Sequence, residues 1–220
     1  MLFRWWERWS ALLGAVTVVC WFVAFSIAGS NPSTDDSDAK IVSWYTSHSH
    51  QLKQIVGFFI FIAGVLCLFG FLSALRTRLL AAEGQPGRLS TLAFGSGVAS
   101  AVLWTVAISL FTAPAFTAND TSASNVVPST FRMFSDFGYQ IWVAAVIVAA
   151  VTVWAASALA IRTGVLPRWF GWIGVVAGIL QLFAIFFIPA FIFWGWILIT
   201  AALLTVRPSP APSAPASSAA

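Results

Sequence analysis

The amino-acid sequence predicts an all-α integral membrane protein, a polytopic bundle of six transmembrane helices with a short amphipathic helix on its outer side. Of the 220 residues, 60% are hydrophobic and only 8% are charged, whereas about a quarter of the residues in soluble domains are charged. Such a chain cannot cover its surface with polar groups in water. Apolar runs long enough to cross roughly 30 Å of hydrocarbon recur along it, and basic residues lie between them.

The count of six depends on the last apolar region, from 169 to 206, which has no charged side chain. As a single helix it would be about 57 Å long, nearly twice the hydrocarbon thickness. Pro189 divides it, and a proline in a helix interior removes a backbone hydrogen bond. We expect a hairpin that turns at the outer interface, with Trp194 and Trp196 as aromatic anchors. The alternative is one kinked, strongly tilted helix. The six predicted spans are 10–28, 54–75, 92–111, 141–161, 169–188 and 190–206.

The basic residues support six crossings with both termini in the cytoplasm, because cytoplasmic loops carry an excess of Lys and Arg. The outer side keeps Lys40, Lys53 and Arg132. Five crossings would place Arg207 outside. We therefore expect a multi-pass protein of the cell (plasma) membrane with cytoplasmic N- and C-termini. The predicted inner residues are Arg4, Arg8, Arg76, Arg78, Arg88, Arg162, Arg168 and Arg207.

The two ends flank a single predicted membrane domain, 1–206. The first apolar run of about 19 residues is longer than the 7–15 of a signal peptide, so we interpret it as a retained span. Trp5, Trp6 and Trp9 are expected to anchor it at the inner interface. The tail 207–220 is only Pro, Ala and Ser after its arginine, a composition typical of disorder.

The first outer loop predicts a short helix. The stretch SNPSTDDSD offers N-cap residues followed by acidic ones, and in AKIVSWYTSHSHQLK the residues Ile41, Val42, Trp44 and Tyr45 give one apolar side. We expect this helix to lie in the membrane interface, with Trp44 and Tyr45 shielded by lipid, and to lead into the second span. The later outer loop, about 112–140, shows no strong pattern.

These features resemble an uncharacterised family of six-span membrane proteins of actinobacterial type, described only as a domain of unknown function. The stretches IVSWYTSHSHQLKQIVGFF, FLSALRTRLL and LPRWFGWIGVVAGI carry the resemblance, which covers roughly residues 10–206. It implies a small helical bundle and supplies no catalytic residues.

The spans contain no ionisable side chain away from their ends, which argues against a proton-coupled transporter or pump. His48 and His50 precede the second span and are weak candidates for a metal site, because residues i and i+2 do not share a helix face. Cys20 and Cys67 lie inside apolar runs as packing residues. No catalytic residue and no cofactor is predicted. The scattered basic residues do not indicate nucleic-acid binding.

The polar groups that remain in the spans are small or neutral. Gln181, with Trp104 and Trp154, forms the candidate ligand-binding set, although a buried amide is more often a hydrogen-bonding contact between helices. Small residues spaced by four, such as Gly174 and Gly178, favour close helix approach within one chain.

Three classes of function stay open. The first is an accessory, scaffold or regulatory protein that packs against a membrane protein partner. The second is a binder or carrier of a lipophilic small molecule within the lipid bilayer. The third is a membrane enzyme with its active site in the outer loops, for which the candidate residues are Asp120, Asp136, His48 and Tyr139.

Overall fold

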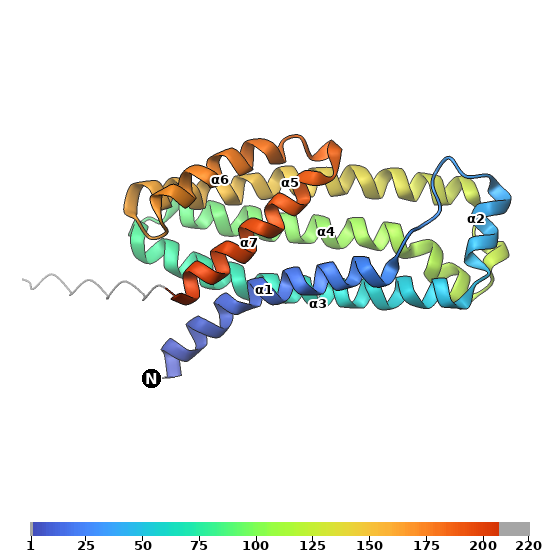
Figure 1. Cartoon of the computed structure of the whole chain (residues 1–220), viewed down its shortest axis with the longest axis horizontal. Coiled ribbons are helices and arrows are strands. Elements are labelled where there is room, and N and C mark those ends of the chain that lie inside the picture. Colours follow the sequence, from blue (N-terminus) through green and yellow to red (C-terminus); the bar gives the residue numbers. More distant parts are fainter. Residues whose placement is uncertain (1, 207–220) are drawn as a thin grey trace, which may run out of the picture.

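The computed structural model describes residues 2–206, with side chains from residue 9 onward, and within that range it is built of helices and turns without a strand. It is an elongated bundle whose long helices run side by side (Figure 1). The all-α prediction is therefore confirmed. The predicted tail 207–220 and the side chains of Trp5 and Trp6 lie outside the described residues. The long helices are α1 (Leu2–Ala28), α3 (His48–Glu83), α4 (Arg88–Asp120), α5 (Pro128–Thr163) and α7 (Ile188–Val206).

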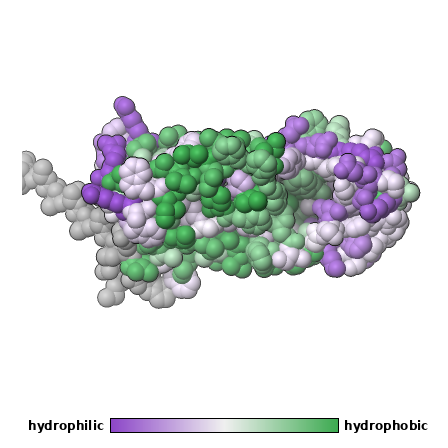
Figure 2. All heavy atoms as spheres, turned by 45° about the horizontal axis from the view of Figure 1, so that its top comes forward, coloured by the Kyte–Doolittle hydropathy of each residue, from purple (hydrophilic) through white to green (hydrophobic). Residues whose placement is uncertain are grey.

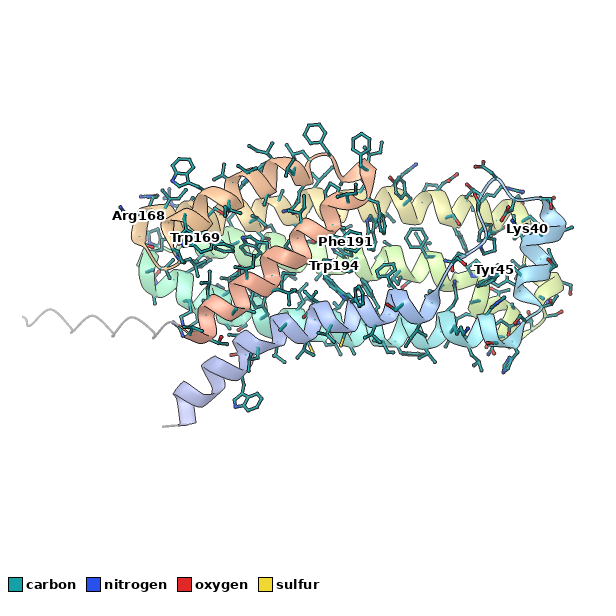
Figure 3. The ribbon with its side chains drawn as sticks, viewed as in Figure 1. Lys40, Tyr45, Arg168, Trp169, Phe191 and Trp194 are labelled. Atoms are coloured by element: carbon teal, nitrogen blue, oxygen red, sulfur yellow. The ribbon has the colours of Figure 1, made fainter. Side chains whose placement is uncertain are left out.

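These five helices are the ones in the described part of the chain that are long and apolar enough to cross a membrane. Figure 2 shows a band of hydrophobic atoms, which we call the apolar belt, between two hydrophilic ends. Arg168 lies at one of these ends (Figure 3). The beginning of α1 and the end of α7 also lie toward that end (Figure 1), as an even number of crossings requires.

The region 169–206 is divided into two helices, as predicted, but the sixth crossing is only approximate. Helix α6 (Arg168–Gln181) has 14 residues, about 21 Å of helix, which is less than the hydrocarbon thickness. The turn η2 (Ala184–Phe186) follows it. The break comes before Pro189, which is the second residue of α7, because proline is tolerated in the first turn of a helix. The side chains of this turn are mainly apolar and exposed.

Helices α3, α4 and α5 continue beyond the outer ends of α1 and the α6–α7 turn (Figure 1). With 36 residues, α3 is about 54 Å long, well beyond the hydrocarbon thickness. The extensions form a structure that we call the outer cap, together with α2 (Asp38–Tyr45) and η1 (Ala123–Asn125). The stretch 112–140, which has no strong sequence pattern, is thus mostly helical. Helix α4 changes direction near its outer end (Figure 1), and Pro114 lies inside it, a common cause of a kink.

The outer cap has its own small apolar core, in which Ile41 and Tyr45 of α2 pack against Phe131 of α5. Ser37 caps α2 by accepting from the Lys40 N–H. The amphipathic helix is confirmed, but the expectation that lipid shields Tyr45 is wrong: its ring is buried against protein. Tyr45 lies in the cap, away from the apolar belt (Figure 3).

The centre of the bundle is a group of stacked aromatic rings. Trp21 of α1 stacks on Phe61 of α3 and on Trp104 of α4, with ring centroids 5.1 Å apart in both pairs. Trp194 of α7 joins them at 5.6 Å from Trp21 (Figure 3). The prediction that Trp194 and Trp196 anchor the turn at the interface is wrong, because both are buried between helices. They follow the turn by more than one helical turn and point inward.

Candidate functional site

A half-open pocket of about 180 Å³ lies at the outer edge of the apolar belt. It is formed where α1 ends and α3 and α4 continue into the cap, with Phe187 reaching it from the α6–α7 turn. Figure 2 shows the surface stepping inward between the apolar belt and the hydrophilic cap. The lining residues are Ala24, Phe25, Ala28, Gly29, Asn31, Gln54, Gly57, Phe58, Phe61, Ile108, Phe111, Thr112 and Phe187.

Each helix presents one face to this pocket. On α3, Gln54, Phe58 and Phe61 follow the i, i+4, i+7 spacing that places side chains on one side of a helix. Gly57 lies between them, and a Cβ there would be 3.0 Å from the Ala24 carbonyl oxygen. Glycine at this position therefore lets α1 approach α3 closely, which closes the inner side of the pocket.

The apolar lining of the pocket is mainly aromatic and is held by the ring cluster behind it. The edge of Phe25 meets Trp142 at a centroid distance of 5.6 Å and Phe61 at 6.1 Å. Phe187 stacks on Trp142 at 5.1 Å. Since these rings contact both the pocket and the buried core, their positions are fixed by packing.

The polar part of the lining is neutral. The Gln54 side-chain N–H donates to the Asn31 side-chain oxygen, and the Thr112 hydroxyl donates to the Ile108 carbonyl, 2.8 Å away, within its own helix. The side-chain oxygen of Gln54 has no hydrogen-bond partner among the described residues, although Gln54 is 1% exposed. None of the lining residues carries a charge.

Phe187 has an unusual backbone for its residue type. Its φ is +62°, a region that L-residues with a side chain rarely adopt. The turn is held by the Phe187 N–H, which donates to the Ala184 carbonyl at 3.0 Å, and by the Tyr139 hydroxyl, which donates to the Ile185 carbonyl. Strained residues of this kind cluster at ligand sites and switch regions.

The residues predicted from sequence as a ligand site do not line this pocket. Trp154 and Gln181 lie near each other at the α5–α6 contact: the Trp154 indole packs across Gly178 and donates to the Val175 carbonyl at 3.2 Å. Gln181 is buried one turn further along α6. Trp104 is elsewhere, in the central ring cluster. Trp154 and Gln181 therefore belong to one part of the bundle, and Trp104 belongs to another.

The outer-loop residues considered for catalysis or metal binding do not form a common site either. His48 contacts Gln51, and His50 stacks on Trp44 at 4.4 Å, so both hold the corner between α2 and α3. Tyr139 holds the α6–α7 turn. The described residues contain no group of three His, Cys, Asp or Glu side chains that is suited to a metal ion.

Sequence reasoning missed Asn31, Gln54 and Phe187. The available signal was the position of Gln54 at the first residue of a predicted span, on the same helix face as two phenylalanines. Asn31 and Phe187 reach this helix face through the contacts between α1, α3 and the α6–α7 turn. No sequence pattern indicated these contacts.

Comparison with known proteins shows a matching family. The model of DUF4386, described as a domain of unknown function, matches residues 11–206. No curated protein and no solved structure matches the chain.

Proposed function

The chain belongs to the DUF4386 family, whose description leaves its function open, and we propose that it binds or carries a neutral lipophilic molecule within the membrane. The observation that supports this function is the pocket at the outer edge of the apolar belt, lined by five phenylalanines and no charged residue. Ligand sites are typically concave and apolar with a few polar groups. This pocket has that composition, and it lies at a depth where a molecule dissolved in the bilayer can reach it.

The size of the pocket restricts the part of the ligand that it holds. A cavity of about 150 Å³ lined by apolar side chains takes up benzene. The pocket, at about 180 Å³, therefore accommodates one ring or the end of a chain. Because it is half-open, the rest of a longer molecule extends out toward the lipid or the cap.

The other two functions lack a feature that favours them. An accessory role needs a face for a partner helix, but the exposed apolar side chains of α1 and α6 are what contact with lipid alone requires. An enzyme in the outer loops needs convergent groups, whereas His48, Asp136 and Tyr139 serve separate parts of the structure or face solvent. The pocket therefore favours the binder over both alternatives.

We place this protein in the cell membrane with the outer cap on the non-cytoplasmic side and both termini in the cytoplasm. The support is the excess of basic residues at the end opposite the cap. In this orientation the pocket lies in the outer leaflet.

Photolabelling of the full-length protein in lipid nanodiscs with an alkyl diazirine tests the binding function. We expect saturable labelling of peptides from the end of α1 and from the pocket faces of α3 and α4. Ala28→Phe should reduce this labelling at least fivefold, because Ala28 lines the pocket and a phenyl ring would fill much of its volume.

Val19→Phe is the matched control for this experiment. Val19 is on the same helix but is 59% exposed on the lipid-facing side, so the same added ring leaves the pocket open. Labelling that is non-saturable over all exposed helix faces, and equal in Ala28→Phe and the unmodified protein, would contradict the proposal.

A further inference from the structure

We infer that the pocket recognises the hydroxyl group of a neutral lipophilic alcohol or phenol, through donation to the side-chain oxygen of Gln54. The inference rests on the proposed function, since it names the ligand class of the same pocket. It starts from one atom, the only buried side-chain oxygen or nitrogen in the described pocket lining that lacks a hydrogen-bond partner.

The side-chain nitrogen of Gln54 is held in place by a hydrogen bond. Its side-chain N–H donates to the Asn31 side chain, which lies in the segment between α1 and α2. Gln54 is also one of the residues that line the pocket. A buried acceptor without a donor is destabilising, so a ligand that supplies a donor gains affinity by removing this cost.

The donor must be neutral. The pocket lining contains no carboxylate or other anionic side chain that would compensate the buried charge of an ammonium group. Ketones, ethers and esters have no donor at all. A hydroxyl group supplies one donor without charge, and its two lone pairs remain for amide N–H groups of the pocket.

The rest of such a ligand matches the remaining lining. Phe58 and Phe111 approach from α3 and α4, and Phe187 from the α6–α7 turn. Five phenylalanines around an amide pair provide an apolar surface with one polar end. An alkyl or aryl alcohol has the same division between a polar end and an apolar body.

Competition between two matched molecules tests the hydroxyl directly. Dodecanol and dodecyl methyl ether are titrated against the alkyl diazirine on the full-length protein in nanodiscs. We expect dodecanol to compete about three- to tenfold better than the ether, the effect of one neutral hydrogen bond at a buried site. In Gln54→Leu and Gln54→Met the preference for dodecanol should fall by this factor, since leucine offers no acceptor and the methionine sulfur is only a weak one.

One control variant isolates the contribution of the Gln54 oxygen. Gln181→Leu removes another buried amide whose oxygen also lacks a partner in the described structure, but which lies outside the pocket, so the preference for dodecanol should persist. Comparing the dodecanol-to-ether ratio of each variant with that of the unmodified protein cancels their different partitioning into the bilayer.

The outcomes separate the two proposals. If both molecules compete equally in the unmodified protein while Ala28→Phe abolishes labelling, the hydroxyl inference is wrong and the lipophilic pocket stands; a water molecule then satisfies Gln54. A preference for dodecanol that survives both Gln54 variants also overturns the inference. If neither molecule competes and Ala28→Phe changes nothing, the proposed function itself fails.

Discussion

Glu83, the last residue of α3, shows how one side chain fixes a helix connection at the inner end. Its carboxylate oxygens accept from the backbone N–H groups of Leu89 and Ser90 at 2.9 and 2.8 Å. These groups belong to the first turn of α4, which has no intrahelical acceptors for them. Burial raises the pKa of Glu83, but the two backbone donors, the Ser90 side chain and the charge of Arg162 together outweigh it and hold the pKa below its ordinary 4.5.

Replacing Glu83 by alanine should lower the free energy of unfolding by about 1 kcal/mol at pH 7, as loss of a helix cap does. Because the pKa is lowered in the folded state, the stabilisation is present above the unfolded pKa and disappears as the pH falls through the folded pKa. Thermal unfolding in detergent from pH 7 to pH 3 should show the gap between Glu83→Ala and the unmodified protein narrowing below about pH 4.5.

Asp120→Ala serves as the control, because Asp120 is exposed at the opposite end of α4 and does not cap its N-terminus. This variant should unfold close to the unmodified protein at every pH. A constant gap for Glu83→Ala across the whole pH range would show that the carboxylate does not act as a cap.

At the scale of elements, the contact between α5 and α6 depends on small residues of α6. The spacing of Gly174 and Gly178 predicts close packing within one chain, and the structure places both glycines on buried positions facing α5. A Cβ on Gly174 would lie 2.0 Å from the Ser157 hydroxyl oxygen, and one on Gly178 would lie 2.2 Å from the Trp154 ring nitrogen. The two helices therefore cannot keep this separation with larger residues.

Gly178→Ala should destabilise the protein by about 1–3 kcal/mol, the usual cost of overpacking a tight contact. The Trp154 indole cannot move away freely, because it donates to the Val175 carbonyl. The measurement is the unfolding temperature in detergent. Gly95→Ala is the matched control: Gly95 is also inside a helix, but a Cβ there meets no atom within 4 Å, so its unfolding temperature should not fall. Equal effects of the two substitutions would contradict the packing explanation.

The whole molecule has two chemically distinct ends. One end carries Arg168 of α6 (Figure 3), with Arg162 of α5 and Arg88 of α4 at the neighbouring helix ends, and the other end is the outer cap. In the cap, Arg132 of α5 donates to the carbonyls of Thr34 and Asp36 and pairs with Asp38 at 2.8 Å. The segment before α2 is therefore tied to α5, and the cap is a folded structure that lies beyond the apolar belt.

Cysteine labelling in intact cells should show the cap outside. In a variant without Cys20 and Cys67, Ser43→Cys in α2 should react with a membrane-impermeant thiol reagent, since Ser43 is exposed. Thr163→Cys, at the exposed inner end of α5, should react only after the membrane is permeabilised. The opposite pattern would mean that the cap faces the cytoplasm and that the basic residues do not set the topology.

The sequence by itself determined the class of the protein, the helical bundle and the division of the region 169–206 into two helices. These properties follow from quantities that add up along the chain: the length of an apolar run, the positions of charges and the presence of Pro189. Local signals also predicted the short helix that begins after Ser37, because its cap residue and apolar side lie within a few positions of each other.

Only the tertiary structure decided which faces of those helices meet. Trp194 and Trp196 have the composition of interface anchors, but the tilt and rotation of α7 bury them against α1 and α6. The outer ends of α3, α4 and α5 are too polar to be identified as membrane spans from hydropathy, and α2 packs against all three of them. The pocket unites Asn31, Gln54 and Phe187 from three separate segments. Hydropathy is a property of each segment alone, whereas a site between segments depends on their mutual packing, which neighbouring residues in the sequence do not encode.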